Sequence, residues 1–252
     1  MKILSIVNQK GGVGKTTTSI NLSACLHKMK RRVLLIDLDP QSNATRGSGI
    51  NPASINASVN DVLLDRSDIC STIINSQSDR YDILPSTPSL TESEVSLLNN
   101  DDREFQLRNK LESIKNSYDY ILMDCPPSLN ILTVNSLVSA TGVLIPVQCE
   151  FYALQGLSEL VNTINQIQSK SNNNLKIEGI LRTMFDSRNN LSSDVSDQLE
   201  QYFPKELYKT KIPRNIRVAE APSHGQSILE YDGLSKGSLS YLSLAGEIIK
   251  DE

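Results

Sequence analysis

The sequence predicts an α/β fold with a mostly parallel central β-sheet flanked by helices on both faces. Short runs of Ile, Leu and Val alternate along the chain with longer segments of helical periodicity, which is typical of such folds. The 252 residues are 38% hydrophobic and 21% charged, so the chain can bury a sizeable core. Because no break in composition marks a boundary, we expect a single domain over residues 1–252.

The first expected element is a buried strand at Ile3–Val7, and a helix over about Lys15–Met29 follows it. The polar stretch Gln41–Asn60 is expected as a long surface loop. The alternation continues to a final amphipathic helix around Leu239–Ile249. Further strands are expected at Val33–Ile36, Tyr81–Leu84, Tyr120–Met123, Val143–Val147, Ile177–Met184 and Leu207–Ile212. Further helices are expected at Arg103–Ile114, Ile131–Ser139, Leu154–Ser169 and Leu191–Tyr202.

Composition excludes several classes of protein. The net charge of −4 excludes a chain that is basic over its whole surface, so nucleic-acid binding would need a local patch. Every apolar run is shorter than the ~18 residues of a membrane span, so we expect a cytoplasmic protein with no membrane contact. The cysteines form no CxxC pair, which argues against a zinc site or a disulfide framework. We expect buried or half-buried thiols at Cys25, Cys70, Cys125 and Cys149.

A glycine-rich loop, from Gln9 to Thr17 (QKGGVGKTT), separates the first expected strand from the first expected helix. Glycines let backbone N–H groups curl around phosphate oxygens, and the helix N-terminus adds a favourable potential. Lys15 supplies a charge for the β- and γ-phosphates, and the Thr16 hydroxyl suits Mg²⁺. The ordinary pattern G-x-x-x-x-G-K-[ST] would need Gly at position 9, where this chain has Gln9. The loop therefore predicts phosphate binding with a departure from the common motif.

Two further expected strands end in carboxylates. Asp37 and Asp39 follow the strand at Val33–Ile36, and Asp124 follows the strand at Tyr120–Met123. The carboxyl ends of parallel strands meet at one edge of a sheet, which is where ligands bind in such folds. Either strand end alone would be weak support, since an Asp there often caps a helix. Together with the glycine-rich loop, they predict a site for nucleotide hydrolysis.

The segment from Lys10 to Thr16 (KGGVGKT) resembles the deviant Walker A motif of the ParA/MinD ATPases. The resemblance extends over nearly the whole chain and is carried by the order and spacing of several segments. The segments similar to chromosomal ParA (Soj-type) partition ATPases are DLDPQ from Asp37, DCPPS from Asp124, TMFD from Thr183, IPRN from Ile212 and EAPSHG from Glu220. The resemblance implies a P-loop NTPase fold of the deviant Walker A type, with ATP and Mg²⁺ as cofactors.

The resemblance also implies a role for individual residues. Lys10 would reach across an ATP-dependent homodimer to the nucleotide of the second subunit, and Asp39 would orient or polarise the attacking water. With Lys15, these two make up the implied catalytic set, and Thr16 and Asp124 would hold Mg²⁺. The implied ATP-binding residues are Lys10, Gly11, Gly12, Val13, Gly14, Lys15, Thr16, Thr17, Met184, Pro213 and Arg214.

In the family that the chain resembles, the ATP-bound dimer binds double-stranded DNA without sequence preference. A ParB-like partner then stimulates hydrolysis and release, so a nucleoid-associated protein is implied. The matching DNA contacts are Arg188 and Arg217. Local charge agrees with this, because one short segment carries five basic residues against Glu206. These basic residues are Lys205, Lys209, Lys211, Arg214 and Arg217.

Alternatives to DNA segregation remain open. A small-molecule ATP-dependent ligase of similar fold, of the dethiobiotin-synthetase kind, would need an acceptor pocket beside the γ-phosphate. Lys10 argues against it, since an inter-subunit lysine serves a nucleotide-gated dimer. A family member that positions another cargo would share every residue named above. A MinD-type membrane anchor is disfavoured, because Leu244–Glu252 carries one lysine among three acidic residues, so we expect the last helix to pack on the core.

Overall fold

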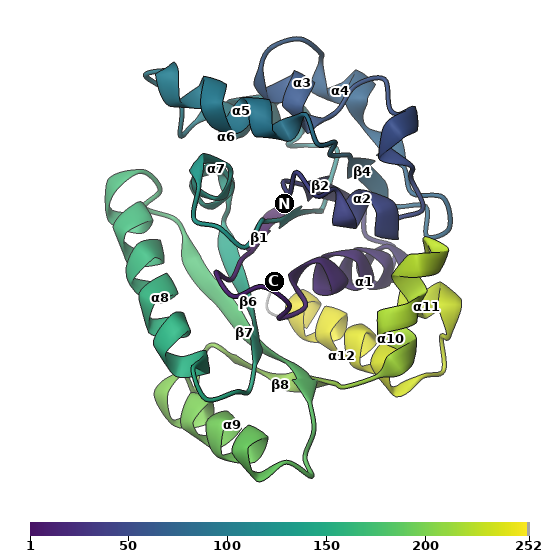
Figure 1. The fold of residues 1–252 in the computed structure, drawn as a ribbon, viewed down its shortest axis with the longest axis vertical. Helices are drawn as coiled ribbons and strands as arrows, with labels where there is room; N and C mark the ends of the chain where they lie inside the picture. Colours follow the sequence, from purple (N-terminus) through teal and green to yellow (C-terminus); the bar gives the residue numbers. More distant parts are fainter. Residues whose placement is uncertain (251–252) are drawn as a thin grey trace.

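Eight strands form one sheet in the computed structural model, which describes residues 1–250 (Figure 1). Their order across the sheet is β3-β4-β2-β5-β1-β6-β7-β8, and within residues 1–250 only the β3–β4 pair is antiparallel. The strands are β1 (Lys2–Ile6), β2 (Val33–Asp37), β3 (Ile74–Asn75), β4 (Asp82–Leu84), β5 (Tyr120–Asp124), β6 (Gly142–Gln148), β7 (Lys176–Phe185) and β8 (Leu207–Pro213). The expected mostly parallel sheet is therefore confirmed.

Helices cover both faces of the sheet, as expected (Figure 1). One face packs against α3 (Val59–Leu63), α5 (Leu90–Ser96), α6 (Gln106–Leu111), α7 (Ile131–Ser139), α8 (Ala153–Lys170) and α9 (Asn190–Tyr202). The other packs against α1 (Lys15–Lys28), α2 (Asn43–Gly47), α10 (Ile216–Glu220), α11 (Ile228–Tyr231) and α12 (Lys236–Lys250). The shorter helices are α4 (Ile69–Thr72), η1 (Pro52–Ser54), η2 (Leu97–Asn99), η3 (Glu112–Ile114) and η4 (Ala221–His224).

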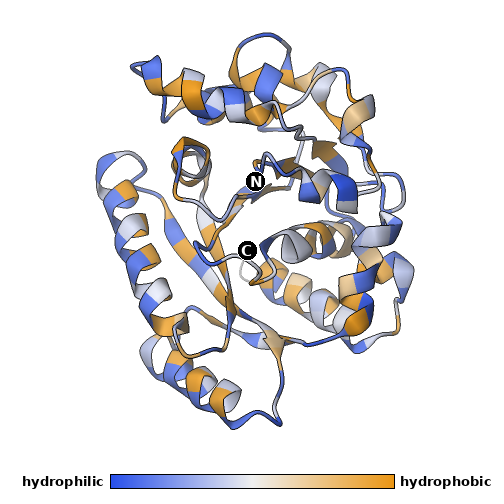
Figure 2. Ribbon diagram, in the orientation of Figure 1, coloured by the Kyte–Doolittle hydropathy of each residue, from blue (hydrophilic) through white to orange (hydrophobic). Residues whose placement is uncertain are grey.

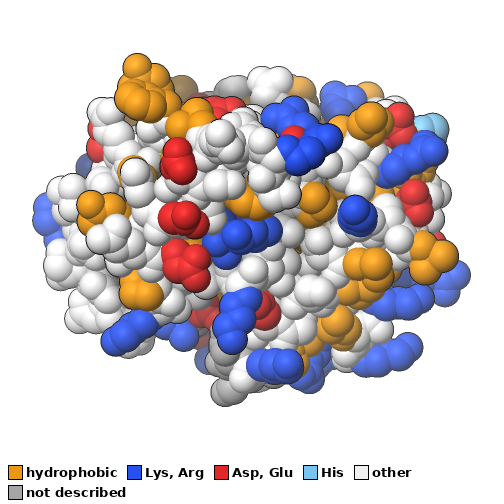
Figure 3. Space-filling view, turned by 90° about the horizontal axis from the view of Figure 1, so that it is seen from below, with side chains coloured by type: hydrophobic (Ala, Val, Ile, Leu, Met, Phe, Trp, Pro, Cys, Tyr) orange, Lys and Arg blue, Asp and Glu red, His pale blue; other side chains and the backbone are white. Residues whose placement is uncertain are grey.

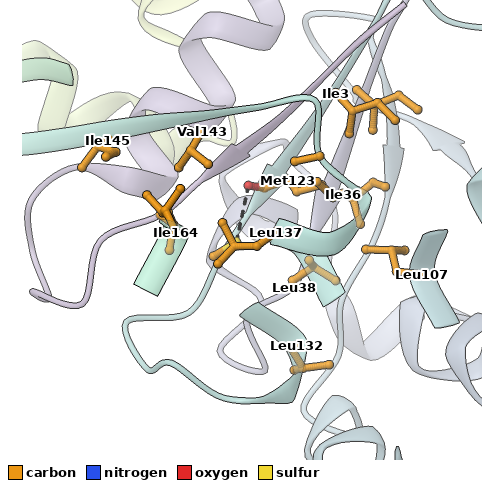
Figure 4. Packing of buried hydrophobic residues seen from close by; sticks show 14 of the residues in the cluster. Ile3, Ile36, Leu38, Leu107, Met123, Leu132, Leu137, Val143, Ile145 and Ile164 are labelled. Carbon is orange, nitrogen blue, oxygen red and sulfur yellow. Dashed lines mark hydrogen bonds between the residues drawn. The ribbon is translucent and has the colours of Figure 1, made fainter. Parts of the chain in front are cut away.

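The core is divided into two layers by the sheet, because successive side chains of a strand point to opposite faces. In β1, Ile3 belongs to the cluster on the α7 face, whereas Leu4 belongs to the cluster on the α1 face. Figure 4 shows Ile36, Met123 and Leu137 of α7 among the side chains of the first cluster. Hydrophobic residues colour much of the central strands in Figure 2. This two-sided burial explains why the strands appear in the sequence as continuous apolar runs.

The last helix packs on the core, as expected. Tyr241, Leu244 and Ile248 of α12 are buried in the cluster that also holds α1. No helix within residues 1–250 has the length and apolar character needed to cross a membrane. Asp251 and Glu252, which belong to the acidic C-terminal segment, lie outside the described residues.

Two expectations were wrong, and one helix was expected to begin too early. The stretch Gln41–Asn60 is not a plain surface loop, because it contains α2, η1 and the start of α3, and Ala44 and Thr45 are fully buried. The hydroxyls of Thr45 and Ser48 bond to the buried Asp37 and Tyr81, which composition alone does not indicate. The helix expected at Arg103–Ile114 is limited to α6 and η3. Cys70 is exposed in α4, whereas the other three thiols are buried.

Candidate functional site

The glycine-rich loop connects β1 to α1 at the carboxyl edge of the sheet. Gly12 and Gly14 have positive φ angles of 73° and 89°, which side chains rarely allow. A Cβ atom at Gly11 or Gly12 would meet no heavy atom within 4 Å, so the loop borders open space. Gly14 is the N-cap of α1 and offers no side-chain cap, so the start of the helix presents its N–H groups to an anion. These residues fit the phosphate groups that the sequence predicts.

Lys15 is the first residue of α1 and is only 7% exposed. Its Nζ donates to the carbonyl oxygen of Lys10, 3.3 Å away. Burial lowers the pKa of Lys15, while Asp124, Cys125 and Asp39 act in the opposite direction. A buried ammonium group is costly unless it has an anionic partner. The position of Lys15 is therefore suited to binding the charge of phosphate groups.

Asp124 lies beneath the loop at the end of β5 and is fully buried. Its carboxylate accepts hydrogen bonds from the Thr16 hydroxyl at 2.7 Å and the Ser19 hydroxyl at 2.9 Å. Asp37 is its register neighbour in β2. Burial raises the pKa of both aspartates; the like charge of Asp37 adds to this effect at Asp124, and the like charge of Asp39 adds to it at Asp37. The oxygens of Thr16 and Asp124 are hard donors of the type that Mg²⁺ prefers, so the pair fits a Mg²⁺ site completed by phosphate oxygens.

Asp39 follows β2 and lines the cleft in front of the loop. The residue is 8% exposed, and its Oδ1 accepts a hydrogen bond of 2.9 Å from the N–H of Gln41. The position agrees with the role expected for Asp39, since its carboxylate belongs to the wall of the phosphate-binding cleft.

Lys10 is placed differently from Lys15, although both belong to one loop. Its side chain is 43% exposed, and its Nζ forms an ion pair with Glu150, which follows β6. Lys10 does not line the cleft of its own chain, whereas Lys15 does. Lys15 can therefore contact a ligand in the cleft of its own chain, whereas the side chain of Lys10 lies outside that cleft.

A cleft of about 630 Å³ joins the loop to the ends of β7 and β8. It brings together most of the residues implied for ATP binding. These are Gly11, Gly12, Gly14, Lys15, Thr16, Thr17, Met184, Pro213 and Arg214. Val13 is buried beside the cleft, and its carbonyl oxygen accepts a 2.7 Å hydrogen bond from the Thr183 hydroxyl at the end of β7. Met184, with a positive φ of 48°, turns into the cleft directly after that bond.

Several residues of the cleft were missed by sequence reasoning. They are Gln41, Asn43, Pro127, Ile216, Val218, Ala219 and Tyr241. Asn215, which ends the IPRN segment, also lines the cleft, and it gives a local signal for the helix that follows because Asn is a preferred N-cap residue. Its side chain accepts from the N–H groups of Arg217 and Val218, which fixes the start of α10 against the cleft.

The two arginines expected to bind DNA lie outside this cleft and are exposed. Arg188 is paired with Asp186 at 2.8 Å, and Arg217 is paired with Glu220 at 3.1 Å. Arg188 borders a separate groove of about 620 Å³, which is also lined by Lys211, Arg214 and Lys236. Lys and Arg side chains are spread over the face seen in Figure 3, with acidic side chains beside some of them. Arg217 is not part of the groove, so the structure does not bring the two arginines into one pocket.

The strand, glycine-rich loop, helix and buried carboxylate define this molecule as a P-loop ATPase. A family model described as "AAA domain" matches residues 1–177. The sporulation initiation inhibitor protein Soj of Bacillus subtilis is 50% identical, over 98% of each chain. The chromosome partitioning protein ParA of Myxococcus xanthus is 48% identical, over 99% of this chain and 88% of that protein. The chain therefore belongs to the ParA/Soj family of partition ATPases.

A solved structure supports the same fold. The crystal structure of cobyrinic acid a,c-diamide synthase from Mycobacterium smegmatis with bound ATP analogue and magnesium has a TM-score of 0.87. That protein is 33% identical, and the match covers 99% of this chain and 95% of that one. The expected deviant P-loop fold and ATPase class are thus confirmed.

Proposed function

We propose that the protein is an ATP-dependent DNA-segregation ATPase. Two subunits with ATP and Mg²⁺ associate face to face, and this dimer binds double-stranded DNA without sequence preference. A ParB-like partner stimulates hydrolysis, after which the subunits separate and leave the DNA. The protein acts in the cytoplasm, on the nucleoid.

The observation that carries this proposal is the contrast between Lys10 and Lys15. Lys15 lies in the cleft of its own chain, whereas Lys10 lies outside it, in an exposed ion pair with Glu150. Exposed ion pairs contribute little, so Lys10 can exchange Glu150 for a stronger anionic partner. The γ-phosphate in the cleft of a second copy is such a partner. Association through this lysine would then depend on ATP rather than ADP.

The cleft supports a nucleotide in one orientation. The loop and Lys15 would hold the phosphates, and Thr16 and Asp124 would hold Mg²⁺. The opposite wall has apolar groups from Met184 and Pro213, against which a purine base can pack. Mg²⁺, when bound, would neutralise charge on the phosphates and give the buried carboxylate of Asp124 a cationic partner. Asp39, at the mouth of the loop, would position the water molecule.

The DNA surface is supported by exposed cations near the ends of β7 and β8. Arg188, Lys211, Arg214 and Lys236 border one groove, and Arg217 lies on the neighbouring helix α10. Arg188 and Arg217 are each paired with carboxylates of their own chain. Because both pairs are exposed to solvent, DNA phosphates can replace the carboxylates as partners.

A small-molecule ligase is the second candidate, because the Mycobacterium smegmatis protein of known structure is named as a synthase. The partition ATPase is favoured because the proteins named Soj and ParA are more similar, at 50% and 48% identity over almost the whole chain. A partition ATPase that carries a cargo other than a chromosome or plasmid would share the same site.

The proposal is tested by ATP turnover and by association. Purified protein is mixed with Mg²⁺ and ATP or ADP, with and without an unrelated DNA duplex and a ParB-like protein. We expect dimers and DNA binding with ATP only, and faster hydrolysis when both DNA and the ParB-like protein are present. Asp39→Ala is expected to bind ATP and DNA but to hydrolyse slowly. ATP turnover that is unaffected by DNA and instead requires a small carboxylate acceptor would support the ligase.

A further inference from the structure

The backbone of Asp39 is held by a buried polar network between β2 and β4. These strands run parallel, and Ile36 is the register partner of Leu84. Beyond this pair the two segments stay close, and Ser86, two residues after Leu84, meets Asp39, three residues after Ile36. The hydroxyl of Ser86 donates to the carbonyl oxygen of Asp39 at 2.8 Å, and the N–H of Asp39 donates to Oδ1 of Asp37 at 3.1 Å. Both the N–H and the carbonyl oxygen of Asp39 are therefore held by hydrogen bonds.

Thr45 of α2 joins the two halves of this network. Its hydroxyl donates to Oδ2 of Asp37 at 2.7 Å and accepts from the N–H of Ser86 at 2.9 Å. Its own N–H donates to the same Asp37 oxygen at 2.8 Å. Thr45, Ser86 and Asp37 are each fully buried. Hydrogen bonds between buried groups are shielded from water, and such networks fix one geometry.

Thr45 and Ser86 do not line the cleft, so they would not contact a nucleotide bound there. Asp39 does line the cleft, and the hydrogen bonds from Ser86 and Asp37 act on its backbone. A carboxylate that orients water must be held within a fraction of an ångström, which requires a second layer of hydrogen bonds. The network supplies such a layer from two chain segments outside the glycine-rich loop.

We propose that Thr45 and Ser86 are positioning residues for the hydrolysis of ATP, acting through the backbone of Asp39. This inference rests on the proposed role of Asp39 in hydrolysis. The geometry gives Thr45 the central place, because its single hydroxyl links Asp37 to Ser86. Loss of that hydroxyl would let the two strand ends move relative to each other, while the phosphate loop would keep its own contacts.

The test compares Thr45→Val with Thr45→Ser. Valine keeps the volume of threonine but lacks the hydroxyl, whereas serine keeps the hydroxyl and loses a methyl group. We expect Thr45→Val to lower kcat about tenfold with KM for ATP within about twofold, because misplacement of a reacting group by about 1 Å can cost up to about 100-fold. Thr45→Ser is expected to stay within about twofold of the natural protein. A role in packing alone would give the opposite order, and that result would overturn the proposal.

Ser86→Ala is the second variant and removes only the hydroxyl that bonds to Asp39. It is expected to lower kcat several-fold while ATP affinity, measured with a fluorescent nucleotide analogue, stays unchanged. If Thr45→Val does not fold, Ser86→Ala alone tests the positioning role. An unchanged kcat in Ser86→Ala would contradict the proposal. Asp39→Ala is measured alongside. If Asp39→Ala hydrolyses ATP normally, the proposed role of Asp39 fails. If Asp39→Ala is slow but Ser86→Ala turns over normally, only the present inference fails.

Discussion

Lys10 in the glycine-rich loop is paired with Glu150, 140 positions further along the chain, and neither residue lines the cleft beside that loop. The pair is exposed, with 43% and 46% of the two side chains accessible. It therefore holds Lys10 weakly, and in the proposed dimer it would have to break before Lys10 could reach the second copy.

Glu150→Gln removes the charge that competes for Lys10. We expect the ATP-bound dimer to form at a lower protein concentration, by no more than about 30-fold, since a symmetric dimer breaks two exposed ion pairs and each contributes about 1 kcal/mol at most. Analytical ultracentrifugation with ATP and Mg²⁺ measures the change. Glu112→Gln is the matched control, because it breaks another exposed pair, with Lys115, outside the cleft. A weaker dimer in Glu150→Gln alone would mean that Glu150 supports association instead of opposing it.

Gly11→Val is expected to block the ATP-bound dimer while leaving the single chain folded. A Cβ atom at Gly11 would meet nothing within 4 Å, and this glycine is not among those with positive φ, so the chain tolerates a side chain there. A branched side chain would instead occupy the space in which two loops meet. Light scattering with ATP, together with thermal unfolding, measures both effects. Gly12→Val is the contrasting variant, since its φ of 73° makes any side chain strained and lowers stability. An ATP-dependent dimer of normal affinity in Gly11→Val would place the interface elsewhere.

Arg188→Ala and Arg217→Ala are expected to weaken DNA binding equally on unrelated duplexes, with ATP binding and dimer formation unchanged. Each change removes two phosphate contacts from a symmetric dimer, so the slope of log affinity against log salt should fall by about 2. Gel shifts with ATP at several salt concentrations give the slope. Arg66→Ala is the control, because Arg66 is also exposed and ion-paired, with Glu92. If neither variant differs from this control, the DNA surface does not include these arginines.

Asp119→Asn is expected to lower stability at neutral pH and to have no effect in acid. The hydrogen bond and charge of Arg32 lower the pKa of Asp119 to about 2. A lowered pKa stabilises the folded state above the unfolded value of 3.8, and the gain is lost as pH falls through about 2. Because the pair is exposed, we expect a difference below about 1 kcal/mol. Urea unfolding of both proteins at pH 7, at pH 3 and below pH 2 measures it. The difference should be smaller at pH 3 than at pH 7 and vanish below pH 2, and an equal difference at all three values would exclude the ion pair as its source.

The sequence allowed the sheet and the phosphate loop to be predicted because both leave local signals. Buried strands such as Ile3–Val7 appear as apolar runs, and the loop is one continuous segment. The region of α3, α4 and α5 was missed because helices of 4 to 7 residues are too short to show a clear period. The far wall of the cleft could not be predicted from local pattern, because Tyr241 reaches it only through the packing of α12 against α1 and β8.

The two edge strands of the sheet bear on how this protein avoids aggregation. An edge strand exposes unpaired backbone groups that can join the sheet of another molecule. One edge, β3, is only two residues long, and the other, β8, carries Lys209 and Lys211. The N–H of Thr210 on that edge is already bonded to Glu247 of α12 at 3.2 Å. Copies of the chain can therefore be crowded together with little tendency for their sheets to join edge to edge.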